Sequence, residues 1–112
     1  MAIHGIQVYE ILENGNLLNG IYTNTGLLDT NQIDNEIARK RQYDNNGVKG
    51  HYDCTYTESW DSSVTHCELV ISKNNGIYLF TWNELNEPNK ILWTGIGLMS
   101  GTSHISVSYI KP

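Results

Sequence analysis

The sequence predicts an all-β protein, an eight-stranded antiparallel up-and-down meander that closes into a small barrel. Three Asn-Gly pairs, Asn14-Gly15, Asn46-Gly47 and Asn75-Gly76, each lie between two apolar or aromatic runs. Asn-Gly is a strong hairpin signal because both residues tolerate the positive φ of a type I′ turn. Ser100-Gly101 supplies a fourth turn. No stretch keeps the 3.6-residue apolar period of a helix over several turns.

With these turns fixed, each apolar or aromatic run becomes one strand. The longest polar connection, Gly26 to Asn35, either covers one mouth of the barrel or is a plain surface loop. The expected strands are His4–Leu12, Leu17–Thr25, Glu36–Tyr43, Val48–Glu58, Thr65–Lys73, Ile77–Leu85, Ile91–Met99 and His104–Lys111.

Size and charge narrow the classes of protein. A chain of 112 residues with 39% hydrophobic content is expected to form one domain, residues 1–112. The net charge of −5 would repel phosphate backbones, so we expect no nucleic-acid partner. No apolar run approaches the length of a membrane-spanning helix, and the N-terminus lacks the pattern of a secretory signal. We therefore expect no membrane partner and a cytoplasmic location.

Strand pairing can be predicted because antiparallel partners in one hairpin have residue numbers with a constant sum. A two-residue turn at Asn75-Gly76, and a turn near Trp60 and Asp61, place one continuous apolar face across three strands. The predicted pairs on this face are Lys73 with Tyr78, Ile71 with Phe80, Leu69 with Trp82 and Tyr52, Cys67 with Cys54, and Thr65 with Tyr56.

The last hairpin has two possible orientations. A turn at Gly101-Thr102 pairs Thr94 with Tyr109 and leaves Trp93 on the outer face beside glycines. The competing interpretation inverts these two strands, so that Trp93 points inward.

We expect the sheet to close into a barrel because an open sheet would be prone to aggregation. An open eight-stranded sheet would expose two long edges and a whole apolar face, and both favour aggregation. A closed barrel of eight strands has an interior that is either just filled by side chains or able to hold one small ligand.

In topology the chain resembles the calycin-type small barrels, which include lipocalins, fatty-acid-binding proteins and avidins. Lipocalins and avidins carry a Gly-x-Trp in the first part of the barrel. The nearest match here is Gly20-Ile21-Tyr22, with Tyr in place of Trp. The resemblance implies a ligand-binding function and leaves the ligand open, and no binding residue of these families can be transferred.

The expected inner face is rich in aromatic side chains, which either fill the barrel or line a cavity in it. In the second case, tyrosine hydroxyls and an indole N–H would present fixed polar groups to a small planar or polar ligand. The candidate ligand-binding aromatics are Tyr52, Tyr56, Tyr78, Trp82 and Tyr109, with Phe80 beside them.

Three consecutive basic residues leave the sign of the ligand charge open. A two-residue connection at Asn46-Gly47 sends Arg39 and Arg41 inward, whereas a three-residue bulged turn sends Lys40 inward. Inward arginines would favour an anionic ligand, because the guanidinium matches carboxylate and phosphate geometry. Alternatively the strand lies at an edge and all three charges are solvated.

Two further clusters follow from the same register. Cys54 and Cys67 lie side by side on the inner face, where we expect reduced thiols, with a disulfide or an assisted metal site as alternatives. On the outer face Asp53 opposes Glu68, close to histidines; this is either a solvated exterior or an ion site. We expect no cofactor and no metal.

Three functions are compatible with this sequence. The first is a barrel that binds a small ligand, either anionic or planar and polar. The second is a protein-interaction or homodimeric scaffold that uses Trp93 and Trp60. The third is a small barrel enzyme, which is the weakest because no nucleophile lies beside a base at a recognised spacing.

Overall fold

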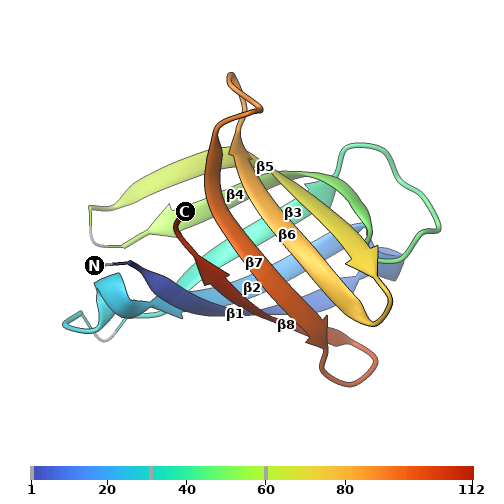
Figure 1. Cartoon of the computed structure of the whole chain (residues 1–112), viewed down its shortest axis with the longest axis horizontal. Helices are drawn as coiled ribbons and strands as arrows, with labels where there is room; N and C mark the ends of the chain where they lie inside the picture. Colours follow the sequence, from blue (N-terminus) through green and yellow to red (C-terminus); the bar gives the residue numbers. More distant parts are fainter. Residues whose placement is uncertain (1, 31, 60) are drawn as a thin grey trace.

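The protein is an antiparallel barrel of eight strands in sequential order (Figure 1). The structure, a computed structural model, describes residues 2–30, 32–59 and 61–112. Short 3-10 turns, η1 (Glu13–Gly15) and η2 (Thr25–Leu27), follow the first two strands. The strands are β1 (His4–Leu12), β2 (Leu17–Asn24), β3 (Asp34–Lys40), β4 (Gly50–Glu58), β5 (Ser63–Asn74), β6 (Ile77–Glu84), β7 (Ile91–Met99) and β8 (His104–Ile110).

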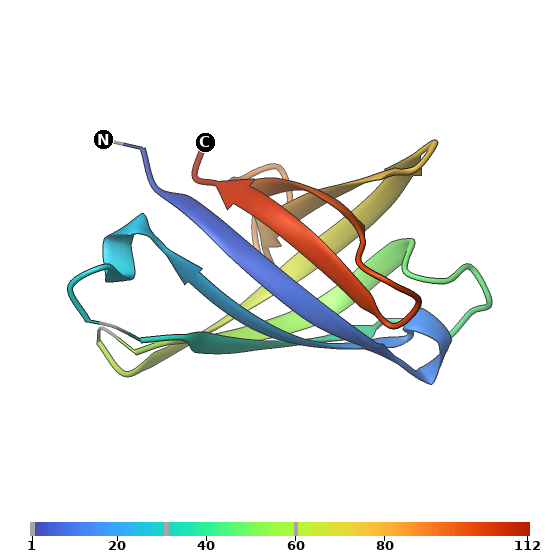
Figure 2. The same ribbon diagram turned by 90° about the horizontal axis from the view of Figure 1, so that it is seen from below.

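The barrel closes between its first and last strands. β1 pairs with β8 from His4↔Ile110 to Glu10↔His104. The two chain termini therefore leave the barrel close together, at the same end (Figure 2). Among the described residues, no helix is long and apolar enough to cross a membrane.

The register predicted for the middle of the barrel is confirmed. β4, β5 and β6 pair as a continuous sheet whose inner face is apolar and aromatic. The observed partners include Cys54↔Cys67, Tyr52↔Leu69, Tyr56↔Thr65, Leu69↔Trp82, Ile71↔Phe80 and Lys73↔Tyr78.

The connection between β3 and β4 is longer than any tight turn at Asn46-Gly47. It takes up residues 41–49, and β3 pairs with β4 through Ala38↔Cys54 and Lys40↔Tyr52. Lys40 is therefore the basic residue that points into the barrel, and Arg39 and Arg41 point out. A hairpin at Asn46-Gly47 was a wrong prediction, because the segment folds back across the barrel end instead of turning tightly.

The last hairpin has the inverted orientation. Its partners are Gly97↔Val107 and Gly95↔Tyr109, so the pairing of Thr94 with Tyr109 was wrong by one residue. The physical reason is that Gly97 faces an aromatic ring: a Cβ there would lie 2.9 Å from Phe80 Cε1. Trp93 shares this inner side and packs against the core.

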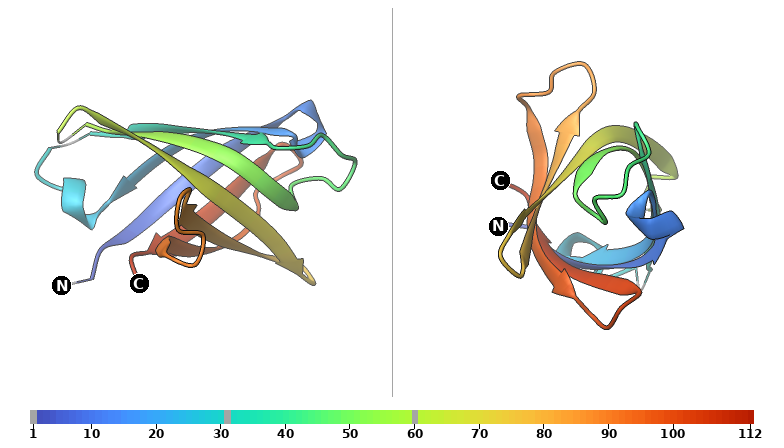
Figure 3. Two further views of the ribbon diagram at one scale, coloured as in Figure 1. Left: turned by 90° about the horizontal axis from the view of Figure 1, so that it is seen from above. Right: turned by 90° about the vertical axis from the view of Figure 1, so that its right-hand side faces the viewer.

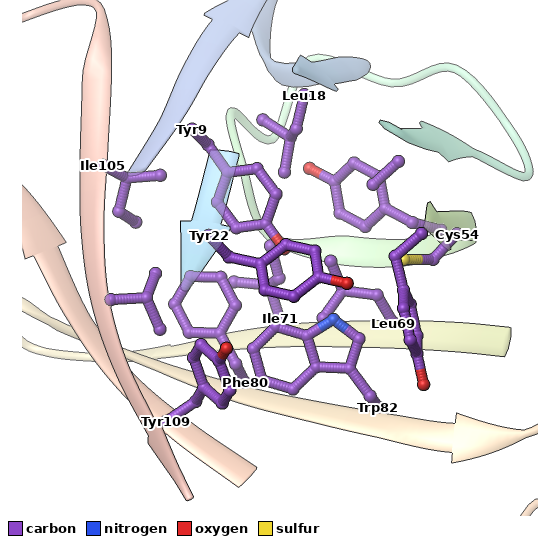
Figure 4. Packing of buried hydrophobic residues seen from close by; sticks show 14 of the residues in the cluster. Tyr9, Leu18, Tyr22, Cys54, Leu69, Ile71, Phe80, Trp82, Ile105 and Tyr109 are labelled. Carbon is purple, nitrogen blue, oxygen red and sulfur yellow. The ribbon is translucent and has the colours of Figure 1, made fainter. Parts of the chain in front are cut away.

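Aromatic side chains make up much of the barrel core. Figure 4 shows the rings of Tyr9, Tyr22, Phe80, Trp82 and Tyr109 gathered in the interior. Tyr9 and Phe80 stack at 6.1 Å between ring centroids, and Phe80 and Trp82 stack at 5.7 Å. The remaining buried apolar core consists of Leu18, Leu27, Ala38, Val48, Tyr52, Cys54, Tyr56, Cys67, Leu69, Ile71, Ile105 and Val107.

Candidate functional site

One end of the barrel is filled by its own chain. We call it the closed end; β1 finishes there at Leu12, β3 finishes at Lys40 and β4 begins at Gly50. The connection 41–49 lies across this end (Figure 3). Val48 is buried in the core, and a Cβ on Gly15 would lie 2.2 Å from the Gly47 carbonyl oxygen. The β1–β2 turn and the connection are thus in direct backbone contact.

Hydrogen bonds fix the closed end from inside. The Lys40 ammonium, 1% exposed as a side chain, lies 2.5 Å from Asp44 Oδ1 and donates to the Gly47 carbonyl oxygen at 2.7 Å. The hydrogen bond from the Lys40 ammonium to the Asp44 carboxylate lowers the pKa of Asp44. The Tyr52 hydroxyl lies 2.7 Å from the Gly15 carbonyl oxygen and 2.8 Å from that of Val48. The named polar groups of this network thus have partners within the protein.

The opposite end contains a cavity of about 720 Å³. We call it the open end; β1 begins there at His4, β2 finishes at Asn24, β3 begins at Asp34 and β4 finishes at Glu58. Leu27 from η2 is buried against its rim. The aromatic side chains that line the cavity are Tyr22, Tyr56, Trp82, Trp93 and Tyr109.

These aromatic rings form a connected wall. Tyr22 meets Tyr56 edge to face at 6.1 Å between centroids and meets Tyr109 at 6.3 Å. Trp93 meets Tyr109 edge to face at 5.3 Å, and Trp82 lies 6.0 Å from Tyr109. Burial raises the pKa of Tyr109 to about 12, so its hydroxyl stays protonated at neutral pH. The wall therefore combines flat apolar surface with neutral hydroxyl groups.

Two carboxyl groups enter the cavity from β3. Asp34 and Glu36 alternate with exposed residues, so both side chains face inward, and both are buried. Trp82 Nε1 donates to Glu36 Oε2 at 3.3 Å, and the Tyr9 hydroxyl donates to the same oxygen. Burial raises the pKa of Glu36, and these hydrogen bonds oppose that rise. Asp34 Oδ2 accepts from the Ser59 backbone N–H at 3.3 Å.

Gln7 is the unusual polar residue of the cavity wall. Its side chain is buried beside the Glu36 carboxyl, with residue exposure of 2%. The Gln7 amide hydrogen-bonds to that carboxyl and opposes the rise in the Glu36 pKa, and Nε2 has no other hydrogen-bond partner among the described residues. Because an amide nitrogen carries two N–H donors, one of them faces the cavity without an acceptor.

Further charges surround the rim. Glu58 accepts a hydrogen bond from the Thr65 hydroxyl at 3.0 Å, and Glu84 lies 3.6 Å from Lys90 Nζ. Lys111 Nζ sits 4.9 Å from the centroid of the Trp93 ring. All of these side chains except Lys90 line the cavity, which is thus acidic, with one lysine at its mouth.

The aromatic candidates predicted from sequence fall into three groups: those that line the cavity, those that lie away from it, and one outside the described residues. Tyr56, Trp82 and Tyr109 line the cavity together, and Trp93 joins them from the inner side of β7. Tyr52 belongs to the closed end, and Tyr78 is half-buried, with Lys73 Nζ 5.4 Å from its ring centroid. Trp60 lies outside the described residues.

Arg39 and Arg41 lie on the exterior. Arg39 Nη1 is 3.7 Å from Glu13 Oε2. Arg41 lies between the two opposed carboxylates predicted on the outer face, 2.9 Å from Asp53 Oδ1 and 2.8 Å from Glu68 Oε2. The prediction of an anionic ligand depended on inward-facing arginines, and both arginines lie outside the barrel. The same ion pairs place a positive charge between the two opposed carboxylates.

The inner cysteines are free thiols in the structure. Cys54 and Cys67 are both buried, and burial raises the pKa of Cys54. The described residues contain no group of three or more His, Cys, Asp and Glu side chains suited to hold a metal ion.

The sequence interpretation missed Gln7, Tyr22, Asp34 and Glu36. The signal for the first two was present, because a turn at Asn14-Gly15 pairs Gln7 with Tyr22, as the structure does. The β3 carboxyl groups were harder to place because polar residues occupy both the inward and the outward positions of that strand. The alternation of apolar and polar residues therefore does not indicate which side of β3 faces the core.

Comparisons of the chain with protein-family models, with curated proteins and with solved structures give no match.

Proposed function

We propose that this protein binds a small molecule in the cavity at the open end of the barrel. The observation that carries the proposal is the contrast between a filled closed end and a cavity of about 720 Å³ at the other end. That volume lies in the range of sites for drug-sized ligands, roughly 300–1,000 Å³. The chain also resembles calycin-type small barrels in architecture, and this resemblance supports a ligand-binding role.

The lining favours a planar and polar guest. Five aromatic side chains provide flat apolar contact, while Gln7 and Glu36 place polar groups at fixed positions. The Tyr22 and Tyr109 hydroxyls donate to the carbonyl oxygens of Thr57 and Thr23, so they offer a ligand only their oxygens as acceptors. A mostly apolar wall with a few placed polar groups is the usual composition of such sites. The ligand would thus lie between rings and be oriented by polar groups from β1 and β3.

A thermal-shift screen of small planar compounds tests this proposal. A ligand at 100 times its Kd stabilises the folded state by about 2.7 kcal/mol, which shifts the melting temperature by several degrees. The substitution Thr65→Trp would fill the cavity, because Thr65 lines it. The neighbouring Val64→Trp, on the exposed face, is the matched control.

The expected result is a shift for hits with wild-type protein and Val64→Trp, and no shift with a folded Thr65→Trp. If Thr65→Trp does not fold, saturation of the shift at one ligand per chain and nuclear magnetic resonance perturbations confined to the open end replace that test. Hits that bind Thr65→Trp unchanged, or perturbations elsewhere, would contradict the proposal.

A second candidate function is self-association through the barrel wall. Large apolar side chains are exposed on the outer face of β1, β2 and β7, among them Ile6, Ile21, Ile96 and Leu98, with β8 between β7 and β1. Exposed apolar patches of this kind mark association surfaces. Sedimentation at rising concentration tests it: a dimer that Ile6→Lys disrupts supports this function, and a monomer throughout rejects it.

A further inference from the structure

The cavity carries a charge pattern that points to one class of ligand. Four carboxyl side chains line it, those of Asp34, Glu36, Glu58 and Glu84, against the single ammonium of Lys111. The buried cation Lys40 is used at the closed end by Asp44 and Gly47. A cleft of one charge sign with apolar walls concentrates small ions of the opposite sign. The interior at the open end is thus arranged for a cation.

The aromatic wall supports the same sign of charge. A cation within about 6 Å of an aromatic centroid is attracted by the ring electrons. The chain already makes this contact at the mouth, where Lys111 Nζ lies 4.9 Å from the Trp93 ring centroid. Trp82 extends the wall inward and donates to Glu36. A ligand cation near that carboxylate would lie beside an indole.

Gln7 adds a second requirement. Its amide is almost completely buried, faces the cavity and hydrogen-bonds to Glu36, which leaves one of the two N–H groups of Nε2 without an acceptor. An N–H donor is satisfied by an acceptor such as a hydroxyl oxygen or a ring nitrogen. The ligand therefore needs an acceptor as well as a positive charge.

We propose that the ligand is a small organic cation, a protonated amine on a flat ring that also carries a hydrogen-bond acceptor. This inference rests on the proposed ligand-binding function. The ammonium lies between the Asp34 and Glu36 carboxylates, which share one face of β3. The ring lies against Trp82 and Tyr109, and the acceptor meets Gln7. Burial raises the pKa of Glu36, and an adjacent cation stabilises its charged form.

Three probes with one ring and different tails test the sign of the charge. Tyramine carries a cationic tail, 4-ethylphenol has a neutral tail, and 3-(4-hydroxyphenyl)propionate has an anionic tail, while all three keep the phenol. Calorimetric titration at pH 7 should give tyramine the highest affinity, by at least about tenfold over 4-ethylphenol, and give the propionate none.

The carboxylates are tested by substitutions that keep their shape. Glu36→Gln should remove most of the tyramine preference, at least about tenfold in Kd, and leave 4-ethylphenol unchanged. Glu10→Gln removes the same charge from an exposed position on β1 and should have no effect. Asp34→Asn provides the same test if Glu36→Gln does not fold.

The outcomes separate this inference from the function on which it rests. Binding of 4-ethylphenol or of the propionate as tightly as tyramine overturns the cation class and leaves a ligand-binding barrel. Tyramine binding that both β3 variants retain overturns the placement of the ammonium. Absence of binding by all three probes, and by the planar compounds of the thermal-shift screen, overturns both proposals.

Discussion

The two ends of the barrel use the same strands in opposite ways. Tyr52 and Tyr56 both face inward from β4, yet the Tyr52 hydroxyl is bonded to two backbone carbonyl oxygens while Tyr56 lines the cavity. On β3, Lys40 is enclosed by the connection 41–49, whereas Glu36 faces the cavity four residues earlier. Buried polar groups thus hold the fold together where the chain covers them. At the open end the polar groups also have partners within the protein, Tyr109 with Thr23 and Glu36 with Trp82, but they border a cavity.

Among the variants that test the difference between the two ends, Lys40→Met is expected to cause the largest loss of stability. Methionine keeps most of the apolar stem but leaves the Gly47 carbonyl oxygen and Asp44 without the ammonium. We expect a loss of about 2 to 3 kcal/mol in the free energy of unfolding, measured by urea denaturation. The cost reflects the hydrogen bonds lost from a buried ammonium and a loosened connection 41–49.

Arg39→Met is the matched control for that variant. It removes the same charge one residue away, from a side chain that is 57% exposed and pairs with Glu13 at 3.7 Å. Its expected effect is within about 0.5 kcal/mol. Equal losses for Lys40→Met and Arg39→Met would show that the enclosed ammonium has no special role at the closed end.

A pair of hydroxyl deletions compares the two ends on one strand. Tyr52→Phe removes the single hydroxyl proton that the carbonyl oxygens of Gly15 and Val48 share, so we expect a loss of about 2 kcal/mol. Tyr56→Phe at the cavity should cost less than about 1 kcal/mol and instead weaken ligand binding. Denaturation curves and ligand titration of both variants measure the two effects. A larger stability loss at Tyr56 would reverse the proposed division of roles.

Sequence reasoning succeeded where turn geometry set the register. The Asn75-Gly76 turn and the alternation of β4, β5 and β6 placed Tyr56 opposite Thr65 and Leu69 opposite Trp82, as observed. Constant-sum pairing is reliable there because a short turn leaves one register that buries the apolar face.

The predicted register was wrong where the connection between two strands was longer than the tight turn expected from an Asn-Gly or Gly-Thr pair. The chain around Asn46-Gly47 folds into the barrel end because Val48 and Lys40 bury side chains there, and no local pattern reports such a contact. At the last hairpin, the connection is residues 100–103, and a one-residue change moved Trp93 from the outer to the inner face. The carboxyl group of Glu36 was missed because burial of a charged side chain depends on partners from β1 and β6.

The two ends should also respond oppositely to pH. Burial raises the pKa of Glu36, so its contribution to stability falls as pH rises from about 4.5, its ordinary value, through the raised pKa. Asp44 has a lowered pKa, so its contribution is present above about 3.8 and is lost as pH falls through the lowered pKa. Glu36→Gln removes only the first response. We expect the stability of this variant relative to wild type to rise between pH 4.5 and pH 8, and denaturation at both pH values measures it. A constant difference would contradict burial of an ionisable Glu36.

A small effect is also expected on the exterior, at Arg41. Its guanidinium lies 2.9 Å from Asp53 and 2.8 Å from Glu68, but the Arg41 side chain is 44% exposed. Solvent and salt screen such pairs, so Arg41→Gln should cost less than about 1 kcal/mol, and the cost should shrink further in 0.5 M sodium chloride. The loss from Lys40→Met should change little with salt, because the Lys40 ammonium is covered by the connection 41–49. Paired denaturation curves at low and high salt therefore distinguish an enclosed cation from a solvated one a single residue away. A strong salt dependence at Lys40 would mean that water reaches the closed end and that the barrel is open at both ends.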